Sequence, residues 1–175
     1  MKKGTKELRN AAGSKGFLNN ADLIELSYFK AVVKEIFRLH PAAPLLVVRE
    51  TIRKSNIEGY DILPKTHVYV NAWAIGRDPN SWKDPEKFIP ERFLESSIDF
   101  KGNDFQLIPF GGGRRICPGL LLGHTIMELA LANLLYSFDW ELPCDLKKAH
   151  MNTDTLPGIT MHKKYPIRLL AKEFH

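Results

Sequence analysis

The sequence predicts a mainly α-helical protein with small β-sheets, built as one globular unit of 175 residues. Three observations support this fold class. Apolar residues recur at helical spacing early in the chain and again after residue 119, β-branched and aromatic runs are short, and a long turn-rich segment separates the two helical parts. The hydrophobic fraction of 44% argues against disorder.

The first elements in the chain are two helices. Residues 6–12 form the end of the first predicted helix, with Gly13 as its C-terminal cap. Ser27 is a suitable N-cap for the second, in which apolar residues recur at helical spacing. Pro41 stops this second helix, which we expect to be packed through its apolar stripe.

The middle of the chain is predicted to be mostly irregular. β-Branched and aromatic residues in 45–52 and 67–70 predict a small antiparallel sheet, with turn residues between the two strands. From 77 to 113, repeated Asp-Pro pairs and the run PERF indicate a long turn-rich segment. Segments of this kind in compact domains are usually functional.

The last third contains a long helix and a predicted hairpin. Residues 120–138 are largely apolar but carry His124, Glu128 and Asn133, so we expect a buried helix rather than a membrane span. Strands over 159–161 and 167–170 are predicted to pair around a turn at 163–164.

Composition and charge narrow the class of protein. Two cysteines, Cys117 and Cys144, are too few for a disulfide framework and fit a reducing compartment. The basic N-terminus has no apolar stretch behind it, so we expect no membrane segment in this chain and a soluble, cytoplasmic location. The net charge of +5 suits an acidic partner or a solvated basic face, and no motif predicts nucleic-acid binding. The six histidines show no paired metal spacing.

The run FGGGRRICPG at residues 110–119 carries the main chemical signal. Cys117 precedes a predicted helix, whose free N–H groups favour a thiolate, the form that binds a metal. The three glycines let a flat ligand approach the backbone closely. Arg114 and Arg115 provide donors that suit carboxylates, such as the propionates of haem. The run therefore predicts a haem-iron site, with a small core cysteine as the alternative reading.

Three motifs in this order resemble the C-terminal part of the cytochrome P450 monooxygenases. In the haem-binding signature the matching residues are Phe110, Gly113, Arg115, Cys117 and Gly119. Glu35 and Arg38 resemble the family's Glu-x-x-Arg pair, and Arg92 falls in its Pro-Glu-Arg-Phe element. Outside these motifs, the amino-acid sequence is most similar to that of the family's plant microsomal group. The resemblance implies that residues 1–175 are a single partial domain, the C-terminal haem-binding portion of this fold.

The resemblance also assigns roles around the haem. It implies that Cys117 is the catalytic residue and iron ligand, and that Arg115 and Arg49 meet the haem propionates. Phe110 is expected to pack under the porphyrin, with a plain core position as the alternative. For Arg114 we prefer solvent or a partner protein.

The Glu-x-x-Arg pair has two possible readings. An i,i+3 pair with glutamate first is by itself an ordinary surface ion pair, worth only a few tenths of a kcal/mol. The resemblance implies instead that Glu35, Arg38 and Arg92 form one internal network that clamps the irregular segment onto the helix. It also implies that residues 44–47 and 156–159 line the substrate side of the haem.

The implied function is that of a haem-thiolate monooxygenase. The complete family member would insert oxygen into a small hydrophobic substrate, using O2 and electrons from an NADPH-dependent reductase, at the cytosolic face of the endoplasmic reticulum membrane. No segment resembles the family's helix with an acid-alcohol pair on the opposite haem face. Two hypotheses follow: an enzyme portion from a partial gene model or truncation, or a non-catalytic remnant with weak or no haem binding.

Overall fold

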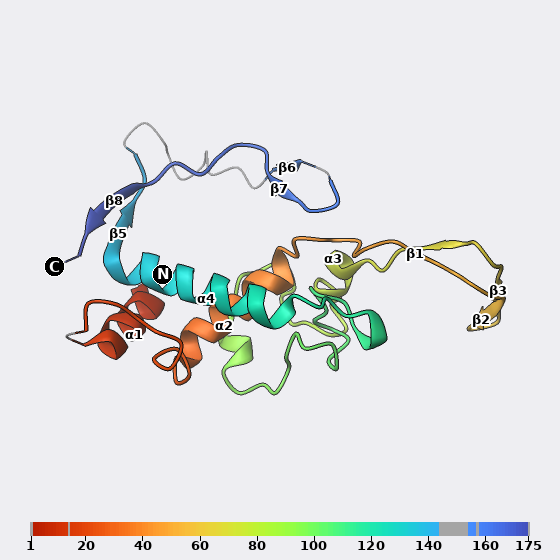
Figure 1. Ribbon diagram of the computed structural model, residues 1–175, viewed down its shortest axis with the longest axis horizontal. Coiled ribbons are helices and arrows are strands. Elements are labelled where there is room, and N and C mark those ends of the chain that lie inside the picture. The colour runs from red at the N-terminus through yellow and green to blue at the C-terminus, as the bar shows by residue number, and fades with distance from the viewer. Residues whose placement is uncertain (1, 14, 144–153, 157, 175) are drawn as a thin grey trace.

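The fold is mainly helical with small sheets, as predicted from the sequence. The structure, a computed structural model, describes residues 2–13, 15–143, 154–156 and 158–174. Its helices are α1 (Lys2–Ala12), α2 (Ser27–Leu39), α3 (Ala72–Ile75) and α4 (Leu120–Ser137), with 3-10 turns η1 (Pro90–Phe93) and η2 (Gly113–Arg115). The helices form an elongated body, from which strands project at both ends (Figure 1).

The strands form antiparallel pairs. In the first half of the chain, β1 (Arg49–Glu50) pairs with β4 (His67–Val68), and β2 (Ser55–Ile57) pairs with β3 (Tyr60–Ile62). In the last part, β5 (Phe138–Glu141) pairs with β8 (Leu170–Glu173), and β6 (Thr155–Leu156) pairs with β7 (His162–Lys163).

The N-terminus of α2 is capped from another helix. The prediction of Ser27 as the N-cap is wrong: Leu26 occupies that position and makes no side-chain cap. Instead, the carboxylate of Glu7 in α1 accepts hydrogen bonds from the backbone N–H groups of Tyr28 at 3.1 Å and Phe29 at 2.8 Å. A negative group suits the positive end of a helix, so a tertiary contact replaces the local cap.

Two other helix ends lie where the sequence predicted them. Gly13 follows α1 with φ +53°, and its N–H donates to the carbonyl of Arg9 at 3.3 Å. Helix α4 ends within one residue of the predicted range. Both ends depend on local sequence, a left-handed glycine in one case and a long, mostly apolar run in the other.

Helices α1, α2 and α4 share one hydrophobic core. Its fully buried members include Leu8, Phe29 and Ala132, one from each of these helices. A second cluster packs the irregular segment against α2 and the start of α4, through Trp82, Phe100 and other apolar side chains. The segment has little regular secondary structure, as predicted, and this second hydrophobic cluster holds it in place.

The expectation that the long helix is buried holds for one face only. Ala132 and Glu128 are buried, but Leu122, Ile126 and Leu134 are between 47% and 69% exposed. By length and composition alone, α4 could also cross a membrane, although core helices of soluble proteins meet the same test. Its inner face belongs to the hydrophobic core, while its outer face has no cover among the described residues.

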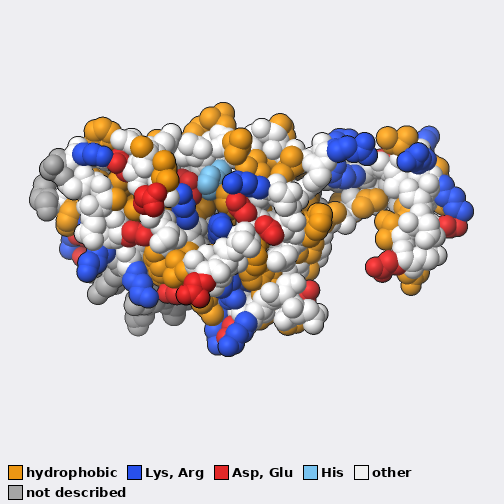
Figure 2. Space-filling view, turned by 90° about the horizontal axis from the view of Figure 1, so that it is seen from below, with side chains coloured by type: hydrophobic (Ala, Val, Ile, Leu, Met, Phe, Trp, Pro, Cys, Tyr) orange, Lys and Arg blue, Asp and Glu red, His pale blue; other side chains and the backbone are white. Residues whose placement is uncertain are grey.

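The strand predictions are only partly correct. The pairing of β1 with β4 lies within the predicted ranges, but the region between them, predicted as turns, holds the β2–β3 hairpin. Asn56 stabilises its turn by accepting the N–H of Gly59 at 3.0 Å, where φ is +88°. This end of the molecule projects from the body and exposes both basic and hydrophobic side chains (Figure 2).

The predicted terminal hairpin is wrong. Residues 159–161 do not pair with 167–170: they lie between β6 and β7, and only Leu170 of the second range lies in a strand, β8, which pairs with β5. Lys163, predicted in the turn, lies within β7. Strand β8 instead pairs with the strand that directly follows α4, a long-range choice that local turn signals do not reveal.

Candidate functional site

A short turn holds the cysteine loop at the start of α4. The Cys117 N–H donates to the carbonyl of Phe110 at 3.0 Å, and the Cys117 carbonyl accepts from Leu120 at 3.3 Å. The first bond closes the loop between its two ends, and the second joins it to the helix. Cys117 is a free thiol and is exposed. Cys144, the other cysteine of the chain, lies outside the described residues.

The glycines of this loop serve two different purposes. Gly111 and Gly113 have φ of +77° and +67°, in the left-handed region that favours glycine. Gly112 instead meets a neighbouring loop, because a Cβ there would lie 3.1 Å from the carbonyl oxygen of Gly102. At least one glycine of the run is therefore tightly packed within the protein, independently of any ligand.

Cys117 lines a cavity of about 380 Å³ between the cysteine loop and the segment before β1. The apolar part of its wall includes Leu46, Val47, Pro109 and Phe110. Arg49 and Arg115 also line it, and the Arg49 Nη2 donates to the Arg115 carbonyl at 3.1 Å. One cavity thus combines an accessible thiol, an apolar wall and two permanent positive charges.

This donor set fits one side of a haem. A thiolate ligates iron, an apolar wall suits the porphyrin face, and arginine forks suit propionates. The residues predicted to line the substrate side of the haem do not all lie at this cavity. Leu46 and Val47 line it, whereas Ile159 is 85% exposed and does not. Arg114 and Gly119 are exposed as well.

The structure brings Glu35, Arg38 and Arg92 together beneath the irregular segment. Glu35 and Arg38 are 0% and 1% exposed, so they are not a surface pair. The Arg38 Nε and Nη2 donate to the two carboxylate oxygens of Glu35 at 2.7 and 2.8 Å. Arg92 Nε donates to Glu35 Oε1 at 3.2 Å. The Glu35 carboxylate therefore accepts hydrogen bonds from two guanidinium groups at once.

The two arginines hold the irregular segment through its backbone. Arg38 donates to the carbonyls of Gly76 at 2.6 Å, Pro85 at 2.7 Å and Lys87 at 3.0 Å. Arg92 donates to the carbonyl of Lys83 at 2.7 Å. An irregular backbone lacks the regular hydrogen bonds of a helix or a sheet. The two arginines therefore donate to carbonyl groups that would otherwise have no backbone partner.

An aromatic cluster connects this network to the cysteine loop. Phe37 of α2 makes edge contacts with Phe110, centroids 5.1 Å apart, and with Phe100 at 5.3 Å. Phe110 therefore both lines the cavity and packs in the core, so both sequence readings describe part of its position. The helix that bears Glu35 and Arg38 thus contacts the loop that bears Cys117.

Sequence reasoning missed a polar pair beside this cluster. His124 Nε2 lies 3.1 Å from Glu128 Oε1 within α4, and the His124 ring lies 4.6 Å from that of Phe100. The i,i+4 spacing of a histidine and a glutamate in an apolar run was the available signal. Trp82 was also missed; its Nε1 is buried without a hydrogen-bond partner, and its ring lies 5.3 Å from the Arg38 guanidinium.

The geometry and the sequence agree with one family, whose sequence model, described as Cytochrome P450, matches residues 1–169. The chain belongs to the cytochrome P450 family. It is 54% identical over 172 residues to cytochrome P450 71A1 of Persea americana and 55% identical over 172 residues to cytochrome P450 71AP13 of Prunus mume. Each alignment covers 98% of this chain but 34% of the relative, so the chain spans about a third of their length.

Solved structures show the same fold. A zebrafish cytochrome P450 determined with abiraterone matches with a TM-score of 0.86 and 26% identity, covering 99% of this chain and 39% of that one. A structure of zebrafish cytochrome P450 with progesterone gives a TM-score of 0.82 and 27% identity, covering 98% and 37%. The described fold is that of the C-terminal portion of a cytochrome P450.

Proposed function

We propose that this chain provides the cysteine-ligand side of a haem-thiolate monooxygenase, as a single partial domain. The observation that carries the proposal is the cavity in which Cys117 meets Arg49 and Arg115 across an apolar wall. Haem, a flat and amphipathic dianion with a metal centre, matches this combination of groups. Family membership supports the same choice of cofactor.

Each group would act on the cofactor in a distinct way. Cys117 would ligate the iron through its sulfur, and the Arg49 and Arg115 guanidinium groups would hold the propionates. Phe110 would pack against the porphyrin. Haem iron, when bound, supplies oxygen activation and substrate oxidation with electrons from a reductase. The loop's contribution is to fix the sulfur at one point, through the bond from its N–H to the Phe110 carbonyl.

The network of Glu35, Arg38 and Arg92 has a structural role in this proposal. It ties the segment before the cysteine loop to α2, while Phe37 ties the loop itself to the same helix. The loop therefore keeps its shape only while this network is intact. Removal of Glu35 would leave the buried Arg38 guanidinium without its carboxylate partner, which costs about 3–5 kcal/mol.

The substrate and partners are proposed for the whole protein. Leu46 and Val47 give the cavity an apolar side, which suits a small hydrophobic substrate. An NADPH-dependent reductase would supply electrons, and the complete protein would act at the cytosolic face of the endoplasmic reticulum membrane. These assignments follow from family membership and from the apolar cavity wall.

A reduced, carbon-monoxide-bound absorption spectrum tests the proposal. The full chain is mixed with hemin, reduced and exposed to carbon monoxide. We expect a Soret band typical of thiolate-ligated iron, and its loss in Cys117→Ser while Arg114→Gln, at a neighbouring exposed position, retains it. A band that survives in Cys117→Ser would exclude Cys117 as the ligand.

The second candidate function is a haem-free remnant. It is favoured by the exposed outer face of α4, because apolar side chains such as Leu122 remain uncovered by the described residues. The same spectrum separates the candidates: a folded chain with no haem band at any hemin concentration would establish the remnant. Circular dichroism on the same sample shows whether the chain is folded.

A further inference from the structure

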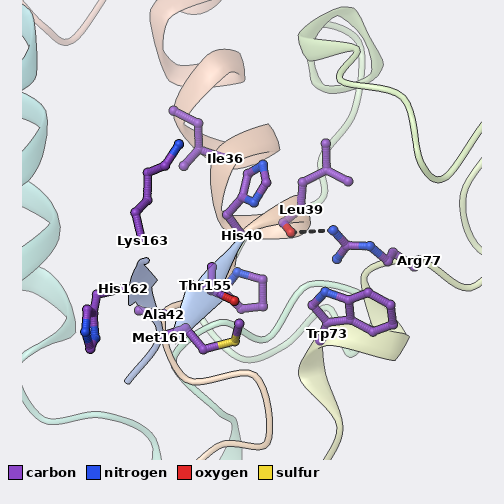
Figure 3. A pocket seen from close by; sticks show the side chains of 11 residues that line it. Ile36, Leu39, His40, Ala42, Trp73, Arg77, Thr155, Met161, His162 and Lys163 are labelled. Atoms are coloured by element: carbon purple, nitrogen blue, oxygen red, sulfur yellow. Dashed lines mark hydrogen bonds between the residues drawn. The ribbon is translucent and has the colours of Figure 1, made fainter. Parts of the chain in front are cut away.

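A second cleft lies apart from the cysteine cavity, between the C-terminus of α2 and the β6–β7 hairpin. Its volume is about 590 Å³, within the usual range for small-molecule sites. Figure 3 shows Lys163 and His162 of the hairpin on one side, with His40, Trp73 and Arg77 on the other. The two cavities have only Ala42 in common among their described lining residues.

The hairpin wall of the cleft is fixed to the body. The Met161 N–H donates to the Ala42 carbonyl at 2.7 Å, which joins the strand region to the segment that follows α2. Within the hairpin, β6 pairs with β7, and the Lys164 N–H donates to the Asp154 carbonyl at 2.9 Å. The cleft therefore has two walls held together by the protein's own hydrogen bonds.

The lining of the cleft is amphipathic. Ile36, Leu39, Trp73 and Met161 provide apolar surface, with the cations Arg77 on one wall and Lys163 on the other. Among the described lining residues there is no aspartate or glutamate. Such a cleft favours a ligand with an apolar body and an anionic end.

Arg77 places a permanent cation in the wall. Its side chain is 11% exposed, stacks on Trp73 at 4.2 Å, and donates through Nη2 to the Leu39 carbonyl at 2.7 Å. Its Nε donates to exposed Glu86 at 3.2 Å, but Nη1 is buried without a hydrogen-bond partner. A buried donor without an acceptor is unfavourable, so an oxygen brought by a ligand would relieve that cost.

The electrostatic environment of His40 agrees with this arrangement. Partial burial of its ring and then the positive charges of Arg77 and Lys163 hold the pKa of His40 below its usual value of 6.5. His40 is therefore mainly neutral at pH 7, and the cleft carries a positive potential that disfavours further positive charge. An anion would be attracted by the same field.

We propose that the cleft between α2 and the β6–β7 hairpin binds an amphipathic carboxylate, with its anionic end at Arg77, its chain along Leu39, Trp73 and Met161, and Lys163 on the opposite wall adding to the positive field. This site is separate from the proposed haem cavity and does not depend on haem binding. A cationic or neutral ligand of the same length would lack the attraction of the two cations.

Titration of the full chain with dodecanoate tests this site, with tryptophan emission as the readout. We expect a saturable change that is lost in Trp73→Phe, because Trp73 lines the cleft. Dodecanol and dodecyltrimethylammonium should bind at least fivefold more weakly. No saturable change with dodecanoate, or equal binding of all three probes, would overturn the proposal.

Adjacent lysines provide a matched control. Lys163 lines the cleft and Lys164 does not. Lys163→Met should raise the Kd for dodecanoate at least fivefold, whereas Lys164→Met should change it less than twofold. Equal effects of the two substitutions would overturn the assignment.

A further pair of variants separates this site from the cysteine cavity, which also holds arginines. Arg49→Met and Arg115→Met should leave dodecanoate affinity unchanged, and added hemin should not displace the probe. Weaker binding in these variants, or displacement by hemin, would place dodecanoate in the cysteine cavity and overturn the proposal. Absence of haem binding alone would contradict the proposed function and leave this site intact.

Discussion

At the scale of single residues, Arg38 has the densest set of contacts in the proposed site. It donates to both oxygens of Glu35 and to three backbone carbonyls, a pattern that needs the planar fork of arginine. Arg38→Lys should therefore lower the free energy of unfolding by about 3 kcal/mol or more, or prevent folding, because a buried charge loses partners.

Urea unfolding followed by circular dichroism measures this change. Arg114→Lys provides the control, since Arg114 is exposed and should tolerate lysine within about 0.5 kcal/mol. Equal stability of the two variants would contradict the view that the fork geometry of Arg38 holds the irregular segment.

Two glycines at opposite extremes of packing make a second comparison. A Cβ at Gly76 would lie 2.4 Å from the Arg38 carbonyl oxygen, and the same backbone offers little room to shift. Gly76→Ala should lower the free energy of unfolding by roughly 2 kcal/mol or more. In α4, Gly123 has nothing within 4 Å, so Gly123→Ala should raise it by up to about 1 kcal/mol through helix propensity. Thermal unfolding of both variants measures these opposite changes in stability: we expect a lower melting temperature for Gly76→Ala and a higher one for Gly123→Ala.

His40 makes stability depend on pH. Burial, together with nearby positive charge, lowers its pKa from 6.5 in the folded state, so the unfolded chain binds the proton more readily. Its effect is negligible well above pH 6.5 and grows as the pH falls through that value, which lowers stability. His40→Gln should therefore lose less stability than the native chain between pH 7.5 and 5.5, measured by urea unfolding. An identical loss in both proteins would remove His40 as the cause.

The residue scale also shows what the sequence could predict about the site. Glu35, Arg38, Arg92 and Cys117 sit in short motifs with fixed spacing, so the sequence alone is enough to recognise their side chains. The carbonyl acceptors at Gly76, Pro85 and Lys87 could not be recognised in this way, because a backbone group has no sequence signature.

At the scale of elements, the cap of α2 depends on a different helix. Glu7 in α1 accepts two backbone N–H groups at the start of α2. Glu7→Gln removes the charge and weakens the cap, so it should cost about 1 kcal/mol in free energy of unfolding. Exposed Glu25, two residues before Ser27, makes no side-chain hydrogen bond at this helix end among the described contacts and serves as the control in Glu25→Gln. A larger loss for Glu25→Gln would contradict this assignment of the cap.

The elements also show why strand predictions failed where helix predictions succeeded. Helices α2 and α4 follow from apolar spacing within a single segment, whereas β5 finds its partner β8 about thirty residues later. Tertiary contacts determine which strands pair. In the same way, a tertiary contact makes Glu7 rather than Ser27 the cap of α2. Even so, the turn at Asn56 and Gly59 carried a local hairpin signal that the sequence reading took for a plain turn.

At the scale of the whole molecule, the outer face of α4 is an apolar surface that no described residue covers. Leu122, Ile126, Ala130 and Leu134 recur every four residues and are all exposed, while the opposite face joins the core. The chain also spans only about a third of its relatives' length. An apolar stripe of this kind favours association in water.

The 175-residue chain should therefore self-associate through this stripe. The double substitution Leu122→Gln and Ile126→Gln should lower the association constant at least tenfold in sedimentation equilibrium, because it removes the centre of the stripe. Substitution of a comparably exposed apolar pair on the β2–β3 arm, Ile57→Gln and Tyr60→Gln, controls for a general gain in solubility. If the arm variant alone restored the monomer, the projecting arm rather than α4 would be the surface that drives association.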